Sequence, residues 1–298
     1  MPEVEGAKNA KKKKPARAPD TQERREKERL QKAQKAQKTQ KMQKPEQEEP
    51  VMDQPGLTAE QMEQLRRVAG ELGVLLDTQA LERFSLYCAM LLSWNQKINL
   101  TAVRTPEGVL TRHFEDSLTL LKACGQAFPL GKETKIIDVG TGAGFPGVPL
   151  AIARPDVSLT LLDSLQKRLT FLQALLQRLQ LHAQLLHLRA EEGGLLPQLR
   201  ESFDIAVSRA VAPLNLLAEY CLPYVQVGGL LVAMKGPDVA QECDEAQEAF
   251  RVLGGELEQV VPLTLSDGSG RSLVLIRKKA ATPKGYPRHG SKIAKRPL

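Results

Sequence analysis

The sequence predicts an α/β fold built on a doubly wound, mostly parallel sheet. Short β-rich runs alternate with helical segments between about residues 135 and 253, an order typical of parallel sheets. Two further β-rich runs, at about 256–263 and 271–277, are joined by the short glycine-containing stretch SDGSG, which predicts a terminal antiparallel hairpin. A glycine-rich turn also follows the first β-rich run directly, as in α/β proteins that bind nucleoside cofactors.

Each element of the sheet region can be placed from its periodicity and its flanking residues. The expected parallel strands are 135–139, 158–163, 183–188, 203–209 and 230–236. The expected helices are 146–153, 164–180, 213–224 and 238–253.

Three helices are expected before the sheet. Thr58 and Gln61 form a capping-box pattern, which predicts a helix to about residue 72. An amphipathic stretch over 79–94 predicts the second helix. The third begins at Thr105, with Pro106 at its first helical position, and continues to about residue 123. Trp94, at the end of the second helix, is expected in the core rather than on a nucleic-acid base.

Charge and composition divide the chain into four parts. Residues 1–56 hold 15 Lys/Arg against 10 Asp/Glu and almost no large apolar residue, so a disordered Lys/Gln-rich tail is expected. The helical unit is assigned to 57–130 and the sheet domain to 131–279. Residues 277–298 hold eight Lys/Arg and no acid. The basic tail at 280–298 is therefore expected to be a flexible arm on an RNA backbone, or merely a solubility tail.

The composition also limits the class of protein. Hydrophobic residues make up 42% of 298 residues, enough for a substantial core. The four cysteines have no metal-ligand spacing, so no metal site and a reducing cytoplasm are expected. No run of 18 apolar residues and no apolar leader are present, so neither a membrane span nor secretion is expected. Nothing requires more than a monomer.

The most informative motif is IIDVGTGAGFPG at 136–147. Gly140, Gly142 and Gly144 allow a tight turn and a close approach of the backbone to a ligand. Asp138, just before the turn, is expected to position the loop or an amino group of the cofactor. Asp163, at the end of the next strand, can accept hydrogen bonds from ribose hydroxyls. S-adenosylmethionine and NAD both carry such a ribose, so the loop alone leaves both cofactors open.

DVGTGAGFPG resembles the signature of the RsmG or GidB family, the small-subunit (16S) ribosomal RNA guanine-N7 methyltransferases. Other segments resemble this family in the same order: LLSWNQKINLTAV (91–103), RHFEDSL (112–118), FDIAVSRAVAPL (203–214), GGLLVAMKG (228–236) and YPRHGSKIAKRPL (286–298). The resemblance covers about 57–298 and implies the class I methyltransferase fold, which is Rossmann-like. It also implies S-adenosylmethionine as cofactor and small-subunit ribosomal RNA, or the small subunit itself, as substrate.

By position, the resemblance implies cofactor contacts at Gly140, Phe145, Ala190 with Glu191, and Arg209. Arg209 ends a strand at the cofactor edge, where an arginine can bind a carboxylate, an RNA phosphate or the acceptor base, or form a structural ion pair.

Other polar residues are expected near this edge. Lys235 ends the next strand and is expected to bind a phosphate or guide the base, or simply to be solvated. Arg209 and Lys235 are the catalytic candidates. His113 and Asp116, three residues apart on one helix, are expected to touch, either as part of a cleft wall or through a structural hydrogen bond.

The implied chemistry agrees with what the sequence lacks. Guanine N7 carries a free lone pair, so it can attack a sulfonium methyl group in line, without an essential general base; alignment is the main requirement. The four histidines have no triad-like or metal-like context. One alternative is an NAD-dependent oxidoreductase, but no hydride-transfer partner is evident. Another is a methyltransferase-like RNA-binding protein without activity, which a cofactor-affinity measurement would separate.

Overall fold

The computed structural model describes residues 53–128 and 130–298. The tail predicted at 1–56 therefore lies almost entirely outside the described residues. Among the helices described, none combines the length and apolar character that a membrane span requires.

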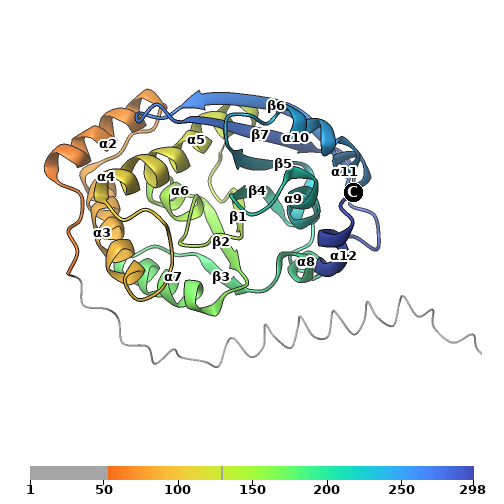
Figure 1. Ribbon diagram of the computed structural model, residues 1–298, viewed down its shortest axis with the longest axis horizontal. Helices are drawn as coiled ribbons and strands as arrows, with labels where there is room; N and C mark the ends of the chain where they lie inside the picture. The colour runs from red at the N-terminus through yellow and green to blue at the C-terminus, as the bar shows by residue number, and fades with distance from the viewer. Residues whose placement is uncertain (1–52, 129) are drawn as a thin grey trace, which may run out of the picture.

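A seven-stranded sheet forms the centre of the molecule, in the order β3-β2-β1-β4-β5-β7-β6 (Figure 1). The strands are β1 (Lys135–Val139), β2 (Ser158–Asp163), β3 (Gln184–His187), β4 (Phe203–Arg209), β5 (Val225–Lys235), β6 (Gly255–Thr264) and β7 (Gly270–Lys278). The first five are parallel, whereas β7 runs antiparallel to β5 and β6. This is the class I methyltransferase fold, so the predicted fold class is confirmed.

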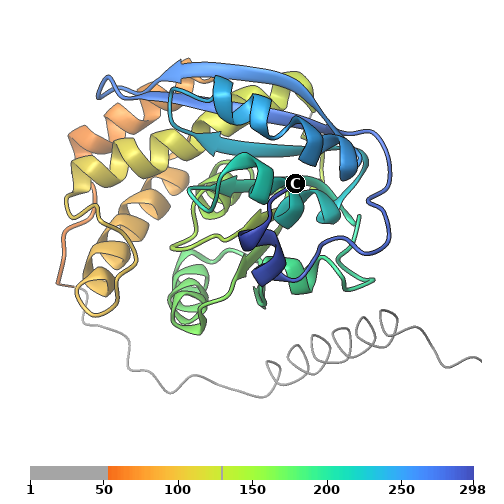
Figure 2. The same cartoon turned by 45° about the vertical axis from the view of Figure 1, so that its right-hand side comes forward.

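Helices cover both faces of the sheet (Figures 1 and 2). They are α2 (Ala59–Glu71), α3 (Thr78–Asn95), α4 (Pro106–Val109), α5 (Asp116–Ala127), α6 (Gly147–Ala153), α7 (Gln166–Leu179), α8 (Ala190–Gly193), α9 (Leu214–Cys221), α10 (Ala240–Glu245), α11 (Gln247–Val252) and α12 (Gly290–Lys295). A π-helical turn η1 (Leu110–Glu115) joins α4 to α5, and a 3-10 turn η2 (Leu222–Tyr224) follows α9.

The two faces of the sheet contribute to two hydrophobic clusters. Successive strand residues alternate between them, as the pleat requires: Ile136 belongs to the first and Ile137 to the second. The first cluster contains side chains of α2, α3, η1, α5, α6 and α7, and includes Trp94. The second contains side chains of α9, η2, α10 and α11. The N-terminal helices thus share one continuous core with the sheet.

Two expected helices are interrupted. The capping box at Thr58 and Gln61 is present and begins α2. The helix expected from Thr105 instead contains the π-helical turn η1. The helix expected over 238–253 is divided at Ala246 into α10 and α11.

The expectation of a flexible arm at 280–298 is wrong, because this segment is docked and ends in α12. Ile293 of α12 is completely buried, and Arg288 pairs with the buried Glu219. Apolar and ionic partners far away in the sequence thus hold a segment that looks like a free basic tail.

Candidate functional site

The glycine-rich loop connects β1 to α6 with backbone conformations that favour glycine. Gly140, Gly142 and Gly144 have φ angles of +74°, +61° and +102°. A Cβ atom at Gly144 would lie 2.7 Å from the hydroxyl oxygen of Tyr87, which donates a 2.6 Å hydrogen bond to the carbonyl of Ala143. Helix α3, which carries Tyr87, therefore packs directly on this loop and fixes its shape.

Asp138 binds the glycine-rich loop from its buried side. Its Oδ2 atom accepts hydrogen bonds from the Thr141 hydroxyl (2.7 Å) and the Gly147 backbone N–H (2.9 Å), and its side chain is fully buried. Burial raises the pKa of Asp138 to about 6, although both hydrogen bonds act in the opposite direction. Of the two roles that the sequence left open, this geometry fits positioning of the loop.

Asp163 connects the end of β2 to the loop. Its Oδ2 accepts the Gly142 N–H at 2.9 Å and an Arg168 N–H at 3.1 Å, while Oδ1 accepts the Leu165 N–H at 2.9 Å. A carboxylate oxygen can accept two hydrogen bonds, so Oδ1 keeps capacity for a ligand. The hydrogen bond from Gly142 therefore fixes the position of the Asp163 carboxylate relative to the loop.

A pocket of about 370 Å³ lies at the carboxyl ends of β1, β2 and β4. Its volume is within the range of about 300–1,000 Å³ that is usual for ligand sites. Of the predicted cofactor residues, four line it: Gly140, Asp163, Ala190 and Glu191. Ala210, Val211, Tyr220, Arg168 and Arg189 are also in its wall. A Cβ atom on Gly140 would lie 2.6 Å from Val211 Cγ2, so only glycine fits there.

A larger cavity of about 940 Å³ lies at the opposite edge of the sheet, near the beginnings of β2 and β3. None of the predicted site residues lines it. Ligands of open α/β sheets bind at the carboxyl ends of the strands, so the smaller pocket is the candidate site.

Phe145 is buried between aromatic rings rather than exposed to the pocket. Its ring stacks on Tyr87 with a centroid distance of 5.1 Å and on His113 with 4.4 Å. The guanidinium carbon of Arg209 lies 4.9 Å from its centroid, within the range of a cation–π contact. Phe145 thus joins the loop to the N-terminal helices and to the end of β4.

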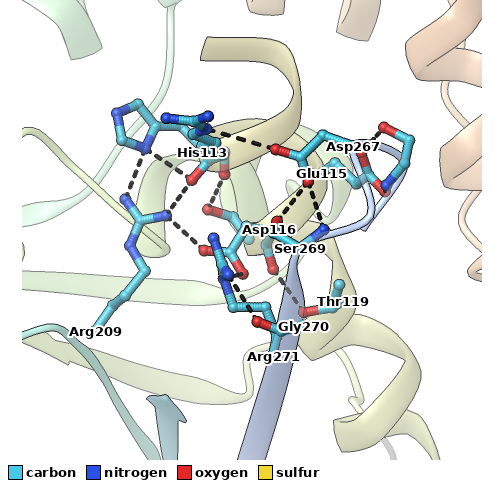
Figure 3. A network of polar contacts seen from close by, with 12 residues as sticks. His113, Glu115, Asp116, Thr119, Arg209, Asp267, Ser269, Gly270 and Arg271 are labelled. Atoms are coloured by element: carbon cyan, nitrogen blue, oxygen red, sulfur yellow. Dashed lines mark hydrogen bonds and ion pairs between the residues drawn. The ribbon is translucent and has the colours of Figure 1, made fainter. Parts of the chain in front are cut away.

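Arg209 connects the end of β4 to η1 (Figure 3). Its Nη1 atom lies 2.9 Å from Asp116 Oδ2 and donates to the carbonyl of Arg112 at 3.0 Å, and its Nη2 lies 3.2 Å from His113 Nδ1. Arg271 of β7 lies on the other side of Asp116, with 3.3 Å between Nε and Oδ1. Arg209 thus contacts both His113 and Asp116, so the two residues expected to touch are linked through its guanidinium group.

The π-helical turn also binds the tip of the β6–β7 hairpin (Figure 3). Glu115 accepts hydrogen bonds from the backbone N–H and the hydroxyl of Ser266, at 2.7 and 2.5 Å. Arg112 pairs with Asp267 at 3.5 Å. A π-helical turn changes the angular spacing of successive side chains and is common at functional sites. Here it directs Arg112, His113 and Glu115 toward the strand ends.

The electrostatic environment of His113 keeps its imidazole neutral. Burial, and then the positive charge of Arg209, lower its pKa from 6.5 to about 3. Its Nε2 lies 2.8 Å from the Thr101 hydroxyl oxygen. A histidine held in this way positions neighbouring groups and is not a base near neutral pH.

This pKa shift predicts a pH dependence of stability. Because the folded-state pKa of His113 lies below the unfolded value, protons bind preferentially to the unfolded chain as the pH falls below about 6.5. Relative to His113→Gln, the wild-type protein should lose about 1.4 kcal/mol of unfolding free energy per pH unit toward pH 4. Urea denaturation of both proteins at several pH values measures this. The Asp138 carboxyl titrates in the opposite sense, but both proteins contain it, so its contribution cancels in the comparison. Parallel pH profiles of the two proteins would contradict the prediction.

Lys235 lies away from the pocket lining. Its ammonium group contacts Glu242 at 2.5 Å and the carbonyl of Ala212 at 2.9 Å. Glu242 also accepts the N–H of Leu214 at 2.7 Å. The lysine therefore ties the chain after β4 to α10. Its catalytic assignment stays a prediction, and its present contacts are structural.

Several residues of the site carry little signal in the sequence. Tyr87 reads as one more apolar position of α3, and Arg271 as part of the hairpin. Tyr220 and Arg189 have no local motif. Each joins the site only through tertiary contacts. In the described part of the chain, no group of three or more His, Cys, Asp or Glu side chains is arranged to hold a metal ion.

The sequence of the chain is similar to that of one known protein family. The family model for rRNA small subunit methyltransferase G, named GidB, matches residues 80–271. Ribosomal RNA small subunit methyltransferase G of Alkaliphilus oremlandii is 46% identical over 237 residues, covering 78% of this chain and 97% of the relative. The same-named protein of Clostridium beijerinckii is 43% identical over 236 residues, with the same coverage.

Among solved structures, the precorrin-6y C5,15-methyltransferase of Geobacter metallireducens aligns with 61% of this chain and 91% of its own length, at 14% identity and a TM-score of 0.42. That likeness is distant, and the assignment rests on the sequence relatives. The matched region contains the glycine loop, Asp163, Glu191 and Arg209. The chain belongs to the rRNA small subunit methyltransferase G family.

Proposed function

We propose that this chain transfers the methyl group of S-adenosylmethionine to N7 of one guanine in small-subunit (16S) ribosomal RNA. The observation that carries the proposal is the pocket at the carboxyl ends of β1, β2 and β4, where Gly140, Asp163 and Glu191 meet. Family membership supports the rRNA substrate, because the relatives are named small-subunit rRNA methyltransferases. The substrate is the RNA or the small subunit that contains it, and the enzyme acts in the cytoplasm as a monomer.

The residues of the pocket fit the cofactor by shape and by chemistry. S-adenosylmethionine would supply a sulfonium methyl group, which the neutral N7 atom of guanine can attack in line without loss of a proton. The loop leaves room for a ligand at Gly140, and Asp163 would accept hydrogen bonds from the ribose hydroxyls. Glu191 would accept hydrogen bonds from other donors of the nucleoside, and Arg209 holds the loop against η1. The protein contributes alignment and exclusion of water, and no step requires His113 as a base.

The test uses small-subunit particles that lack this modification, purified protein and methyl-labelled cofactor. Cleavage selective for N7-methylguanine then maps the label on the RNA. We expect label at one guanine, and less label with Asp163→Ala at limiting cofactor. Label on another atom or base would overturn the N7 assignment. Protein that binds the cofactor but labels neither naked RNA nor particles would contradict the proposed substrate.

Asp163→Ala should weaken cofactor binding by about 1–3 kcal/mol, because charged hydrogen bonds to the ligand are lost. The loop also loses the acceptor for the Gly142 N–H. Isothermal titration calorimetry with S-adenosylmethionine measures the effect. Asp156→Ala is a suitable control, because this aspartate pairs with Arg154 at the opposite edge of the sheet. Equal affinity of Asp163→Ala and the wild type would remove Asp163 from the site.

A further inference from the structure

The chain after β7 is held by side chains from other parts of the fold and from the end of β7 itself. Arg200 donates hydrogen bonds to the carbonyls of Thr282 and Tyr286, both at 2.7 Å. Lys278, completely buried, donates to the hydroxyl of Thr282 and to the carbonyl of Leu222 at 2.9 Å. These contacts fix the path of the segment before it reaches α12.

An ion pair then locks the segment onto α9. Arg288 contacts both carboxylate oxygens of Glu219, with Nη2–Oε2 at 2.6 Å and Nε–Oε1 at 2.9 Å. The backbone N–H of Arg288 donates to Oε1 as well, at 2.6 Å. Glu219 is completely buried, so this pair is shielded from solvent and sets the position of α12 closely.

The result is that α12 touches the wall of the cofactor pocket. A Cβ atom on Gly290, the first residue of α12, would overlap Oε1 of Glu191. Pro287 lies against Gly194, where a Cβ atom would be 3.1 Å from Pro287 Cγ. Glu191 belongs to α8 and lines the pocket. Both views place α12 beside α8 and α9 (Figures 1 and 2).

The carboxylate of Glu191 has weak support from other side chains. In the part of the chain that the structure describes, its charged partner is Arg189, with 3.8 Å between Nη1 and Oε1. The Arg189 side chain is 66% exposed and the 3.8 Å distance is long for an ion pair, so this arginine contributes little to the orientation of the carboxylate. The carboxylate also lies directly against Gly290, where a Cβ atom would overlap it, so α12 limits where it can lie.

We propose that residues 286–295, the C-terminal strap, are a positioning element of the cofactor pocket. The ion pair of Arg288 anchors the strap, and Gly290, which has no side chain, lets the carboxylate of Glu191 keep its place beside the pocket. The inference rests on the proposed function, because it takes S-adenosylmethionine as the ligand. It gives the strap a role in the cofactor site, whereas Lys292, Lys295 and Arg296 remain exposed on its outer side.

A double-mutant cycle on cofactor affinity tests the proposal without RNA. Gly290→Ala should displace the carboxylate of Glu191 and weaken S-adenosylmethionine binding about tenfold, the equivalent of one charged hydrogen bond. The flexible end of Glu191 can rotate away, so the variant folds. The control is Gly70→Ala in α2, where a Cβ atom meets nothing within 4 Å. Calorimetry gives the Kd, and thermal melting reports the stability of each variant.

The second arm uses Glu191→Ala. The atoms that a Cβ atom on Gly290 would meet are those of the Glu191 side chain, so Gly290→Ala should have no further effect on Kd in this background. An equal loss in both backgrounds would mean that the strap acts only through general stability, which would overturn the proposal. So would unchanged affinity of Gly290→Ala. Failure of the wild-type protein to bind the cofactor would instead contradict the proposed function itself.

Discussion

Arg288→Ala should lower the free energy of unfolding by about 3–5 kcal/mol, the cost of leaving a buried charge without its partner. Glu219 is completely buried, and its carboxylate receives three donors from Arg288, two from the side chain through Nε and Nη2 and one from the backbone. The backbone donor alone remains in the variant. Urea denaturation at neutral pH, followed by circular dichroism, measures the change.

Two further variants make this result interpretable. Arg251→Ala removes an arginine that pairs with Glu248 on the surface and should change stability little, because exposed pairs contribute little. Adding Glu219→Gln to Arg288→Ala removes the buried charge and should recover part of the lost stability. A loss for Arg288→Ala no greater than for Arg251→Ala would show that the strap is not anchored by this ion pair.

Arg209→Ala should lower kcat/KM for RNA methylation about 100-fold, because small misplacements of aligned groups have effects of this size. Arg209 holds Asp116 and the carbonyl of Arg112 with one nitrogen and lies over the Phe145 ring. Without it, the cofactor loop and η1 lose their common partner. Initial rates with labelled cofactor and particles lacking the modification measure the effect.

Arg277→Ala is the matched control for this loss of activity. The Arg277 side chain is 15% exposed and that of Arg209 is 16% exposed. Arg277 also bonds a carboxylate and a backbone carbonyl, those of Glu258 and Gly228, but these two partners belong to β6 and β5 and not to η1 or the glycine-rich loop. We expect lower stability with unchanged kcat/KM below the melting temperature. Similar activity losses in both variants would assign Arg209 a purely structural role.

The architecture of the sheet region could be predicted from the sequence alone. All seven expected strands are present, although β5 begins earlier than predicted, at Val225. Strand periodicity, glycines with positive φ and the capping box at Thr58 are local signals, and local signals can be read without knowledge of the fold. The pocket residues Gly140 and Asp163 could be predicted for a related reason, because strand ends in a parallel sheet meet at one edge. Glu191 was implied by the family resemblance.

The contacts that hold the site residues in place, in contrast, join residues far apart in the sequence and are visible only in the folded chain. Arg209 and Asp116 are 93 positions apart in sequence, and Glu115 and Ser266 are 151 apart. The π-helical turn and the docked strap both depend on such distant partners. A run of basic residues is the same in sequence whether it is solvated or docked. The difference lies in Glu219, Arg200 and Glu191, which the fold brings beside it and which no local pattern in the sequence connects to it.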